Sequence, residues 1–340
     1  MREIGGYLEL ECFHGREYHE NAIGLNCGRN ALAYLIEAYG IKRIFLPFFL
    51  CDSVVDVCKK YSVEVHFYSI GEDFSPILPA SLASSDWLYI VNYYGQLDYG
   101  LMLNVGTENI IVDNAQDFFR MPLPGMTALY TCRKFFGVSD GAYLYTDRLL
   151  ERSLEIDQSY NRMGFVLGRF ERSAGEFYQA ASENNRFFSG QPVMSMSLLT
   201  QNLLRAVDYE EIKRKRTENF LYLHSVLGGQ NKLKLSVPDG AFAYPLYVDD
   251  GMRMRKQLAQ NKIYIPTLWP NVLDSCPVSS MRQTSFPFRL TKGMGGGYGV
   301  YSGNHTINIT YTCVSGGNNG GQNCYYWGKG NSCSHCRTNS

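Results

Sequence analysis

Two short segments of the 340-residue chain carry side chains that could perform chemistry together. Val112–Gln116 (VDNAQ) places Asp113 after an apolar run, as is typical of a buried parallel strand that ends at a carboxylate. Thr131–Gly137 (TCRKFFG) places Lys134 three positions after Thr131, between two strand-like stretches. A carboxylate can keep a pyridine nitrogen protonated, and a lysine amine can form a Schiff base. Together they predict a site for pyridoxal 5'-phosphate (PLP).

The predicted chemistry gives each side chain its own task. PLP acts as an electron sink, and it does so best when a carboxylate such as Asp113 keeps the ring nitrogen protonated. Lys134 would carry the cofactor and then move a proton at the reacting carbon. Taken alone, each residue has an ordinary interpretation. An Asp at a strand end is commonly a turn or cap residue, and a Lys beside Arg133 is commonly a solvated surface charge. The prediction therefore depends on the two segments occurring together.

A third segment contains a glycine turn that leads into a predicted helix. Gly28, Arg29 and Asn30 open an amphipathic stretch whose apolar residues recur at helical spacing. A helix start exposes unpaired backbone N–H groups and the positive end of the helix dipole, and both favour phosphate. An ordinary Asn/Gly helix cap is the alternative. Because the other two segments are present, we interpret this one as the cradle for the cofactor phosphate.

The chain resembles the DegT/DnrJ/EryC1/StrS aminotransferases, the sugar-aminotransferase branch of the fold type I PLP enzymes. The resemblance extends from Gly24 to Ser280 and rests on these segments: Asn26–Leu32, Ile44–Cys51 (IFLPFFLC), Val91–Gly95 (VNYYG), VDNAQ, and TCRKFFG with the later DGAYLYTD. It implies an α/β fold in which a mostly parallel sheet is flanked by helices. A smaller α+β domain would follow towards the C-terminus.

The resemblance also implies a role for each matching residue. Asp113 would lie on the pyridine nitrogen, Gln116 beside the ring hydroxyl, and Lys134 would form the Schiff base. Thr131 best matches the hydroxyl that helps to hold the phosphate. Many family members instead carry Ser five positions before the lysine, where this chain has Leu129. The expected cofactor-binding set is completed by Gly28, Arg29 and Asn30.

Two positions depart from the family pattern. Family members place an aromatic residue over the cofactor ring, and here Cys51 falls nearest that position, so Phe49 or another residue would have to cover the ring. In the family an Asn from the other subunit touches the phosphate, and the Asn185 segment (NRF) is the nearest match, a poor one. Aromatic candidates for the wall of the site, with core packing as the alternative, are Tyr93, Tyr94 and Trp269.

The chain is expected to divide into a large domain, a small domain and a tail. Residues 1–230 would form the large PLP-binding domain, with alternating strands and helices through residue 150 and amphipathic helices at Leu198–Leu204 and Tyr209–Leu227. The charged run in the second helix is predicted to be a solvated face. Residues 231–281 would form a small, truncated C-terminal domain. Its predicted elements are strands at Ala241–Val248 and Lys262–Pro270 and a helix at Met252–Gln260.

Residues 282–340 differ from the rest of the chain. They are rich in Gly, Asn, Ser, Thr and Cys and show no amphipathic period. Decoding 280–294 and then 294–308 in shifted frames permits, in register, an ending typical of the family. We therefore hypothesise two small insertions or deletions in the coding sequence, which would make this tail out-of-frame translation, disordered or poorly packed. Its CxxC lacks a second ligand pair, so no metal site is predicted.

Composition restricts the classes of function. The 32 basic and 32 acidic residues give zero net charge and the basic residues are scattered, so no nucleic-acid partner is expected. No run is long enough to span a bilayer, and the first residues lack the apolar core of a signal peptide. We therefore expect a cytoplasmic protein without a membrane partner. Reduced thiols are expected at Cys27, Cys51, Cys58 and Cys132.

The resemblance implies a PLP-dependent aminotransferase. It would transfer an amino group from an amino acid donor, usually glutamate, to a keto-sugar attached to a nucleotide, in amino-sugar or surface-polysaccharide biosynthesis. Its shared active site implies a homodimer. Two alternatives stay open. One is a PLP-dependent dehydratase or lyase on the same scaffold, although Lys134 argues against those relatives that replace the lysine with His. The other is a degenerate PLP-binding member without catalysis.

Overall fold

The computed structural model describes residues 5–78, 82–100, 105, 107–249, 251–265 and 298–301. Its contacts divide the chain into two units, Met1–Tyr301 and Ser302–Ser340, and every described residue belongs to the first. The Trp269 position and most of the predicted strand Lys262–Pro270 lie outside the described residues. The predicted boundaries of the large domain, the small domain and the tail stay predictions.

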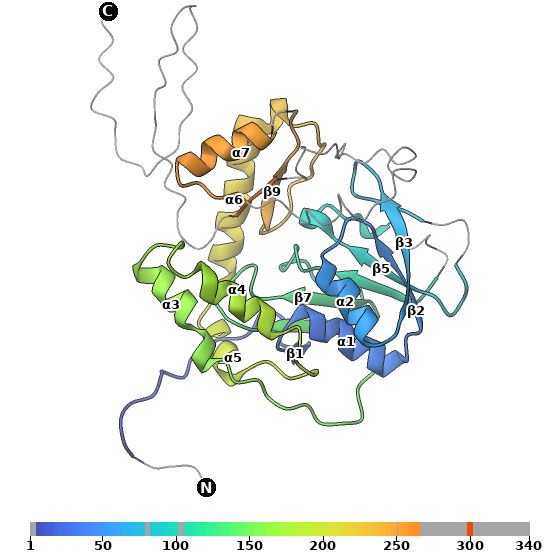
Figure 1. The fold of residues 1–340 in the computed structure, drawn as a ribbon, viewed down its shortest axis with the longest axis vertical. Helices are drawn as coiled ribbons and strands as arrows, with labels where there is room; N and C mark the ends of the chain where they lie inside the picture. Colours follow the sequence, from blue (N-terminus) through green and yellow to red (C-terminus); the bar gives the residue numbers. More distant parts are fainter. Residues whose placement is uncertain are drawn as a thin grey trace, which may run out of the picture. The chain divides into compact units, whose positions relative to one another are not determined.

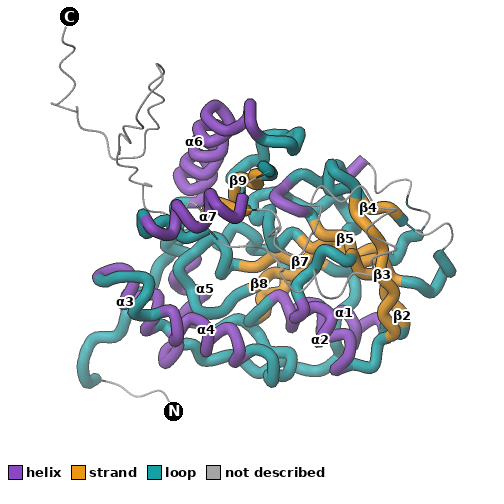
Figure 2. The backbone as a smooth tube through the Cα atoms, turned by 45° about the horizontal axis from the view of Figure 1, so that its top comes forward, coloured by secondary structure: helices purple, strands orange, loops and turns teal. Residues whose placement is uncertain are grey.

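An eight-stranded sheet forms the centre of this unit (Figures 1 and 2). Its spatial order is β1-β8-β7-β6-β5-β2-β3-β4, in which β7, β6, β5, β2 and β3 run parallel and the pairings of β8 and of both edge strands are antiparallel. The predicted mostly parallel α/β fold is confirmed. The strands are β1 (Ile23–Leu25), β2 (Arg43–Pro47), β3 (Glu64–Ile70), β4 (Pro76–Ile77), β5 (Trp87–Val91), β6 (Ile110–Asp113), β7 (Thr127–Thr131) and β8 (Ala142–Tyr145).

Some helices pack on this sheet, and others lead from it to the last strands. In Figure 1, α1 and α2 lie beside the strands, and α6 runs away from them towards β9. Antiparallel to β9 lies β10, which belongs to the residues predicted to be out of frame. The remaining elements are α1 (Gly28–Tyr39), α2 (Asp52–Lys60), η1 (Tyr93–Gly95), η3 (Tyr160–Arg162), α3 (Gly164–Glu171), α4 (Tyr178–Phe187), α5 (Leu198–Leu204), α6 (Tyr209–Leu227), η4 (Gly228–Gln230), β9 (Ala243–Leu246), α7 (Gly251–Gln260) and β10 (Tyr298–Tyr301).

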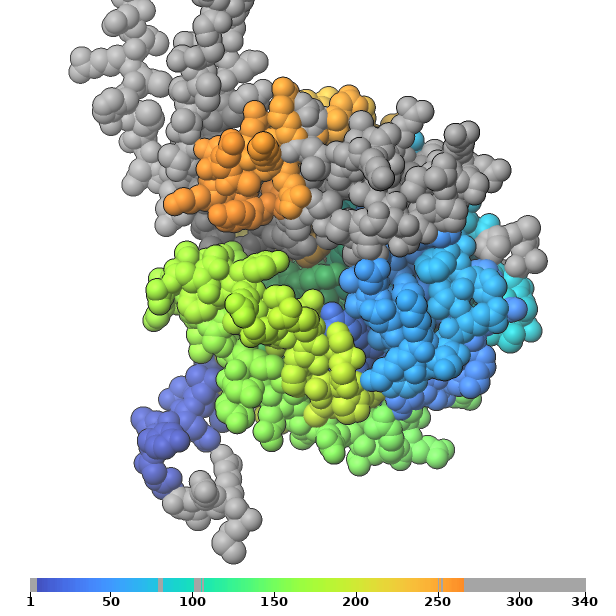
Figure 3. Space-filling view, in the orientation of Figure 1, coloured from blue at the N-terminus to red at the C-terminus, as the bar shows by residue number. Residues whose placement is uncertain are grey.

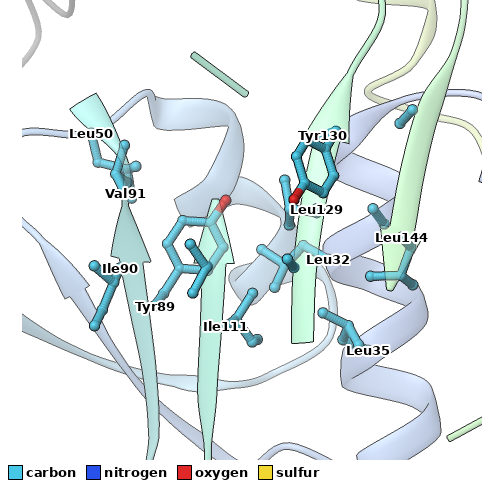
Figure 4. Close-up of a cluster of buried hydrophobic side chains, with 14 of the residues drawn as sticks. Leu32, Leu35, Leu50, Tyr89, Ile90, Val91, Ile111, Leu129, Tyr130 and Leu144 are labelled. Carbon is cyan, nitrogen blue, oxygen red and sulfur yellow. The ribbon is translucent and has the colours of Figure 1, made fainter. Parts of the chain in front are cut away.

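The core lies between the central strands and α1. Every residue of β5 and of β7 is buried, as expected for parallel strands covered on both faces. Figure 4 shows Leu32 and Leu35 of α1 packed towards Leu129 and Leu144 of the sheet. Residues 30–36 of α1 are all buried, so this part of the helix is enclosed on every side within the core. The packing fixes where α1 begins, and therefore where its first turn lies.

Two predictions from the pattern need correction. Strands and helices alternate only as far as β3, because the described residues between β5 and β8 contain η1 but no α-helix. These connections instead hold buried polar side chains such as Asn92, Asn114 and Asp117, which hydrogen-bond to one another. The charged run of α6 is not wholly solvated, because Arg216 is only 4% exposed. Its neighbours Arg214 and Lys215 are exposed, as predicted, and form surface ion pairs.

His19 is a buried titratable group within the aromatic core. Its Nε2 lies 2.8 Å from the carbonyl oxygen of Phe118 and its Nδ1 lies 3.1 Å from the hydroxyl of Tyr145. The ring of Tyr130 is 4.2 Å away between centroids. Burial lowers the pKa of His19 from 6.5 to about 4, and its hydrogen bond to Phe118 opposes this shift. The imidazole is therefore neutral in the folded protein at neutral pH.

His19→Gln should flatten the acid dependence of stability. Unfolded His19 takes up a proton below pH 6.5, whereas the folded residue does so only near pH 4. As the pH falls between these values, the free energy of unfolding of the wild type therefore decreases by about 3 kcal/mol. The variant lacks this decrease. Asp117, whose pKa burial raises to about 6, acts with the opposite sign in both proteins and cancels in the comparison. Urea denaturation between pH 7 and pH 4 gives the free energy of unfolding of both proteins. If it changed with pH to the same extent in wild type and variant, the prediction would be contradicted.

Candidate active site

Three adjacent parallel strands bring the predicted residues to one edge of the sheet. Val91 of β5 is in register with Asp113 of β6, which is in register with Leu129 of β7. Because carboxyl ends of parallel strands meet at the same edge, Asp113 and Thr131 both lie there, and the turn that carries Lys134 follows β7 directly. Ligands of open α/β sheets bind beyond this edge.

Asp113 is held by donors from two directions. The Tyr89 hydroxyl donates to its Oδ2 at 2.8 Å, and the Ala115 N–H donates to its Oδ1 at 2.8 Å. Figure 4 shows the Tyr89 hydroxyl pointing towards the carboxyl ends of the strands. Burial, and next the charge of Asp113, raises the pKa of Tyr89 well above its usual value, so this hydroxyl stays protonated. The carboxylate thus has a fixed orientation. Tyr89 is not among the site residues that the sequence predicts.

Lys134 projects from the tight turn after β7. The N–H groups of Phe135 and Phe136 both donate to the carbonyl oxygen of Cys132, at 2.9 Å. The Lys134 side chain is exposed, and it makes no hydrogen bond or ion pair with any described residue. The protein atoms around it lower its pKa, and the nearby charge of Asp113 partly offsets the effect. An accessible amine without a hydrogen bond or ion pair is suited to covalent attachment to a carbonyl.

Arg216 of α6 joins the lysine turn to the segment before β9. Its guanidinium donates to the carbonyl oxygens of Phe135 at 3.1 Å, Ala241 at 3.2 Å and Phe242 at 3.5 Å. The Phe242 ring centroid lies 5.5 Å from Lys134 Nζ, within cation–π range. Burial lowers the pKa of Arg216 to about 10, a value at which it stays charged at neutral pH. Arg216 therefore fixes both the turn that bears the lysine and the aromatic ring beside it.

Gln116 lies three residues after Asp113, in the loop that follows β6. Its Oε1 accepts a hydrogen bond of 3.0 Å from the N–H of Tyr94, which has a left-handed backbone with φ of 53°. Gln116 is buried, so its side chain braces η1 against the loop after β6. Tyr93 and Tyr94 are 1% and 0% exposed, which indicates core packing for these two candidate wall residues.

The predicted phosphate cradle is organised around the start of α1. Gly28, Arg29 and Asn30 form its first turn, and a Cβ placed on Gly28 would meet only Leu129, at 4.0 Å. Thr131 is buried, and its hydroxyl makes no hydrogen bond with the described residues. The side chain of Asn30 is committed elsewhere, because it donates to Asn26 and to the carbonyl of Pro192. Any contact that Asn30 makes with an anion therefore uses its backbone N–H.

The position nearest the expected ring-stacking residue holds Cys51, the residue before α2. Cys51 is half-buried and accepts a hydrogen bond from Ser53 at 3.2 Å. Phe49 is 2% exposed and packs against Tyr93 with centroids 5.5 Å apart. It is therefore a core residue. Phe242 is the aromatic ring that contacts Lys134.

No protein-family model and no curated protein sequence matches the chain. Solved structures do resemble it. The sugar aminotransferase CalS13 from Micromonospora echinospora superposes with a TM-score of 0.56 at 14% identity, over 83% of this chain and 82% of that one. The PLP-form of the putative sugar aminotransferase Spr1654 from Streptococcus pneumoniae gives 0.52 at 9% identity over 83% and 82%. DesV from S. venezuelae gives 0.52 at 16% identity over 80% and 74%. The chain shares the fold of these proteins.

Among the described residues, no three His, Cys, Asp or Glu side chains are placed to hold a metal ion, and no helix has the length and apolarity to cross a membrane. The five cysteines described, at positions 12, 27, 51, 58 and 132, are free thiols.

Arg216→Met should lower the free energy of unfolding by about 2–3 kcal/mol, because buried carbonyl oxygens lose their donor. Arg214→Met is the matched control, since Arg214 lies on the same helix, exposed, in surface pairs with Glu211 and Glu218. That change should cost less than about 1 kcal/mol. Urea denaturation of both variants measures the difference. Equal losses would show that Arg216 does not hold the lysine turn.

Proposed function

We propose that the chain is a PLP-dependent aminotransferase that moves an amino group from an amino acid donor to a nucleotide-linked keto-sugar. The observation that carries the proposal is that Lys134, which has no hydrogen bond or ion pair with the described residues, and Asp113, oriented by Tyr89, lie at the same edge of the sheet. The fold shared with several sugar aminotransferases supports it. Nothing in the described structure favours the dehydratase or the degenerate reading.

The described residues fit PLP. At one sheet edge lie a lysine amine without a hydrogen bond or ion pair, an oriented carboxylate, a threonine hydroxyl that is not hydrogen-bonded to the described residues, and an open helix start. Asp113 would hold the ring nitrogen, Gln116 would lie by the ring hydroxyl, and Lys134 would attach the cofactor. Gly28, Arg29, Asn30 and Thr131 would hold the phosphate. Bound PLP supplies an electron sink for the charge that develops at the carbon of the substrate.

The protein's own contribution begins with proton placement. Desolvation lowers the pKa of Lys134, which increases the fraction of neutral Nζ available as a nucleophile and later as a base. The Asp113 carboxylate stays in place because its Oδ2 and Oδ1 accept from Tyr89 and Ala115. Phe242, fixed by Arg216, limits the directions in which Lys134 can move.

We infer a homodimer in the cytoplasm that takes part in amino-sugar or surface-polysaccharide biosynthesis. Within it, residues 1–230 form the PLP-binding domain and 231–281 the small domain. The small molecules that it binds are an amino donor and a keto-sugar.

Borohydride reduction after incubation with PLP should attach the cofactor to Lys134. Peptide mapping by mass spectrometry then finds the modified residue, and Lys134→Ala should remove the visible absorbance of the bound cofactor. Lys59→Ala is the control, since Lys59 is an exposed residue of α2. A stable adduct on another lysine, or none on folded protein, would refute the assignment.

Asp113→Asn should slow the first half-reaction with an amino donor by about a hundredfold or more, because the developing charge loses its electrostatic partner. Tyr89→Phe should slow it by about tenfold, since one hydrogen bond to the carboxylate is lost. Tyr68→Phe serves as control, because the Tyr68 hydroxyl donates to the Tyr89 carbonyl and not to Asp113. Stopped-flow absorbance measures all three. Similar rates for Tyr89→Phe and Tyr68→Phe would contradict the role of Tyr89.

A further inference from the structure

Arg133, immediately before Lys134, has a guanidinium group that no described residue pairs. Its Nε is fully buried without a hydrogen-bond partner, and its Cζ lies 4.6 Å from the centroid of the Phe188 ring. The residue as a whole is half-buried, so its terminal nitrogens are the part left open to solvent. It makes no hydrogen bond or ion pair within the described residues. A guanidinium enclosed in this way is costly unless an acceptor satisfies it.

Arg29 brings a second guanidinium to the same place. It donates to the backbone oxygen of Asn185 at 2.7 Å and to its Oδ1 at 3.0 Å. Asn185 and Phe188 are three residues apart at the end of α4, so both arginines contact one side of that turn. Figure 3 shows the α1–α2 segment in blue and the α3–α5 segment in green to yellow side by side. Neither arginine has a carboxylate partner in the described structure, whereas Arg162, against the same turn, pairs with Asp157 at 2.8 Å.

Neither the Arg29 nor the Arg133 guanidinium is neutralised by an ion pair in the described structure. Burial lowers the pKa of Arg133, and the charge of Arg29 lowers it further. Asp140 is a nearby carboxylate, but no ion pair joins it to either arginine in the described structure; it accepts from the Ser197 N–H and hydroxyl at 2.8 Å and from the Thr200 hydroxyl. Two guanidinium groups thus lie against the end of α4 without an ion pair, and a bound anion would supply acceptors for their N–H groups.

We propose that Arg29 and Arg133 form a two-arginine site for a phosphate dianion, which in the proposed enzyme is the phosphate of PLP. The identity of the ligand rests on the proposed function; the anion site rests on the arginines. The first turn of α1, the space at Gly28 and the hydroxyl of Thr131 lie at the same edge of the sheet. Phosphate is then neutralised within one protomer. Asn185, the nearest match to the partner-subunit Asn of the family, acts by holding Arg29.

The test compares ligands with and without the phosphate group. Apo-protein is titrated with PLP and with pyridoxal, for wild type, Arg133→Gln and Arg133→Lys. Arg133→Gln should weaken PLP binding by about tenfold to a hundredfold, the effect of one charge-assisted contact, and leave pyridoxal binding unchanged. Arg133→Lys should recover part of the loss. Arg169→Gln is the control with the same change in charge on exposed α3. If Arg133→Gln does not fold, Arg133→Lys is titrated in its place and should show a smaller loss confined to PLP.

Inorganic phosphate separates this proposal from the proposed function. Phosphate should raise the thermal midpoint of wild type and of Lys134→Ala alike, but not of Arg133→Gln. That result supports the anion site even if PLP never attaches to Lys134. Equal losses for PLP and pyridoxal, or unchanged PLP binding in Arg133→Gln, would overturn the proposal. Weaker binding of UDP with unchanged PLP binding would also overturn it, since the anion would then be a nucleotide diphosphate.

Discussion

The candidate site depends on the register of three parallel strands. Pairing of Val91 with Asp113 and of Asp113 with Leu129 fixes the carboxylate between β5 and β7. A slip of one residue would turn every side chain of β6 to the opposite face and remove Asp113 from Tyr89. The apolar residues of β5 and β7 that hold this register are all buried, so packing places Asp113 at the strand end, and its hydrogen bonds with Tyr89 and Ala115 then orient the carboxylate.

The surroundings of Lys134 come from segments distant in sequence. Arg216 on α6 lies more than eighty residues after the turn that it holds, and Phe242 follows it on the segment before β9. The neighbouring Thr217 accepts from the Gly240 N–H at 2.8 Å, and Lys213 pairs with Asp239 at 2.9 Å. One face of α6 thus fixes the whole 239–242 segment against the lysine turn. This arrangement sets the distance between a flexible amine and its aromatic neighbour.

Local pattern predicted much of the fold and part of the site. Helices α5 and α6 begin and end at the predicted residues, and Asp113 and Lys134 lie at the predicted strand end and turn. Those signals are short-range: apolar periodicity, a glycine turn and a strand end. Tyr89 and Arg216 escaped prediction because their roles arise from contacts across the sheet and between distant helices. Arg216 sits in a charged run in which Arg214, Lys215 and Glu218 are exposed, so periodicity gave no sign that one arginine is buried.

The hydrogen bonds on Asp113 also determine what else it can accept. An ionised carboxylate has about four lone-pair positions, two on each oxygen. In the described structure one position on Oδ2 is filled by Tyr89 and one on Oδ1 by Ala115. Each oxygen therefore retains one vacant acceptor position in a carboxylate plane that its two donors have already fixed. A ring N–H can bind there without displacing either donor, so its direction of approach is set before any ligand arrives.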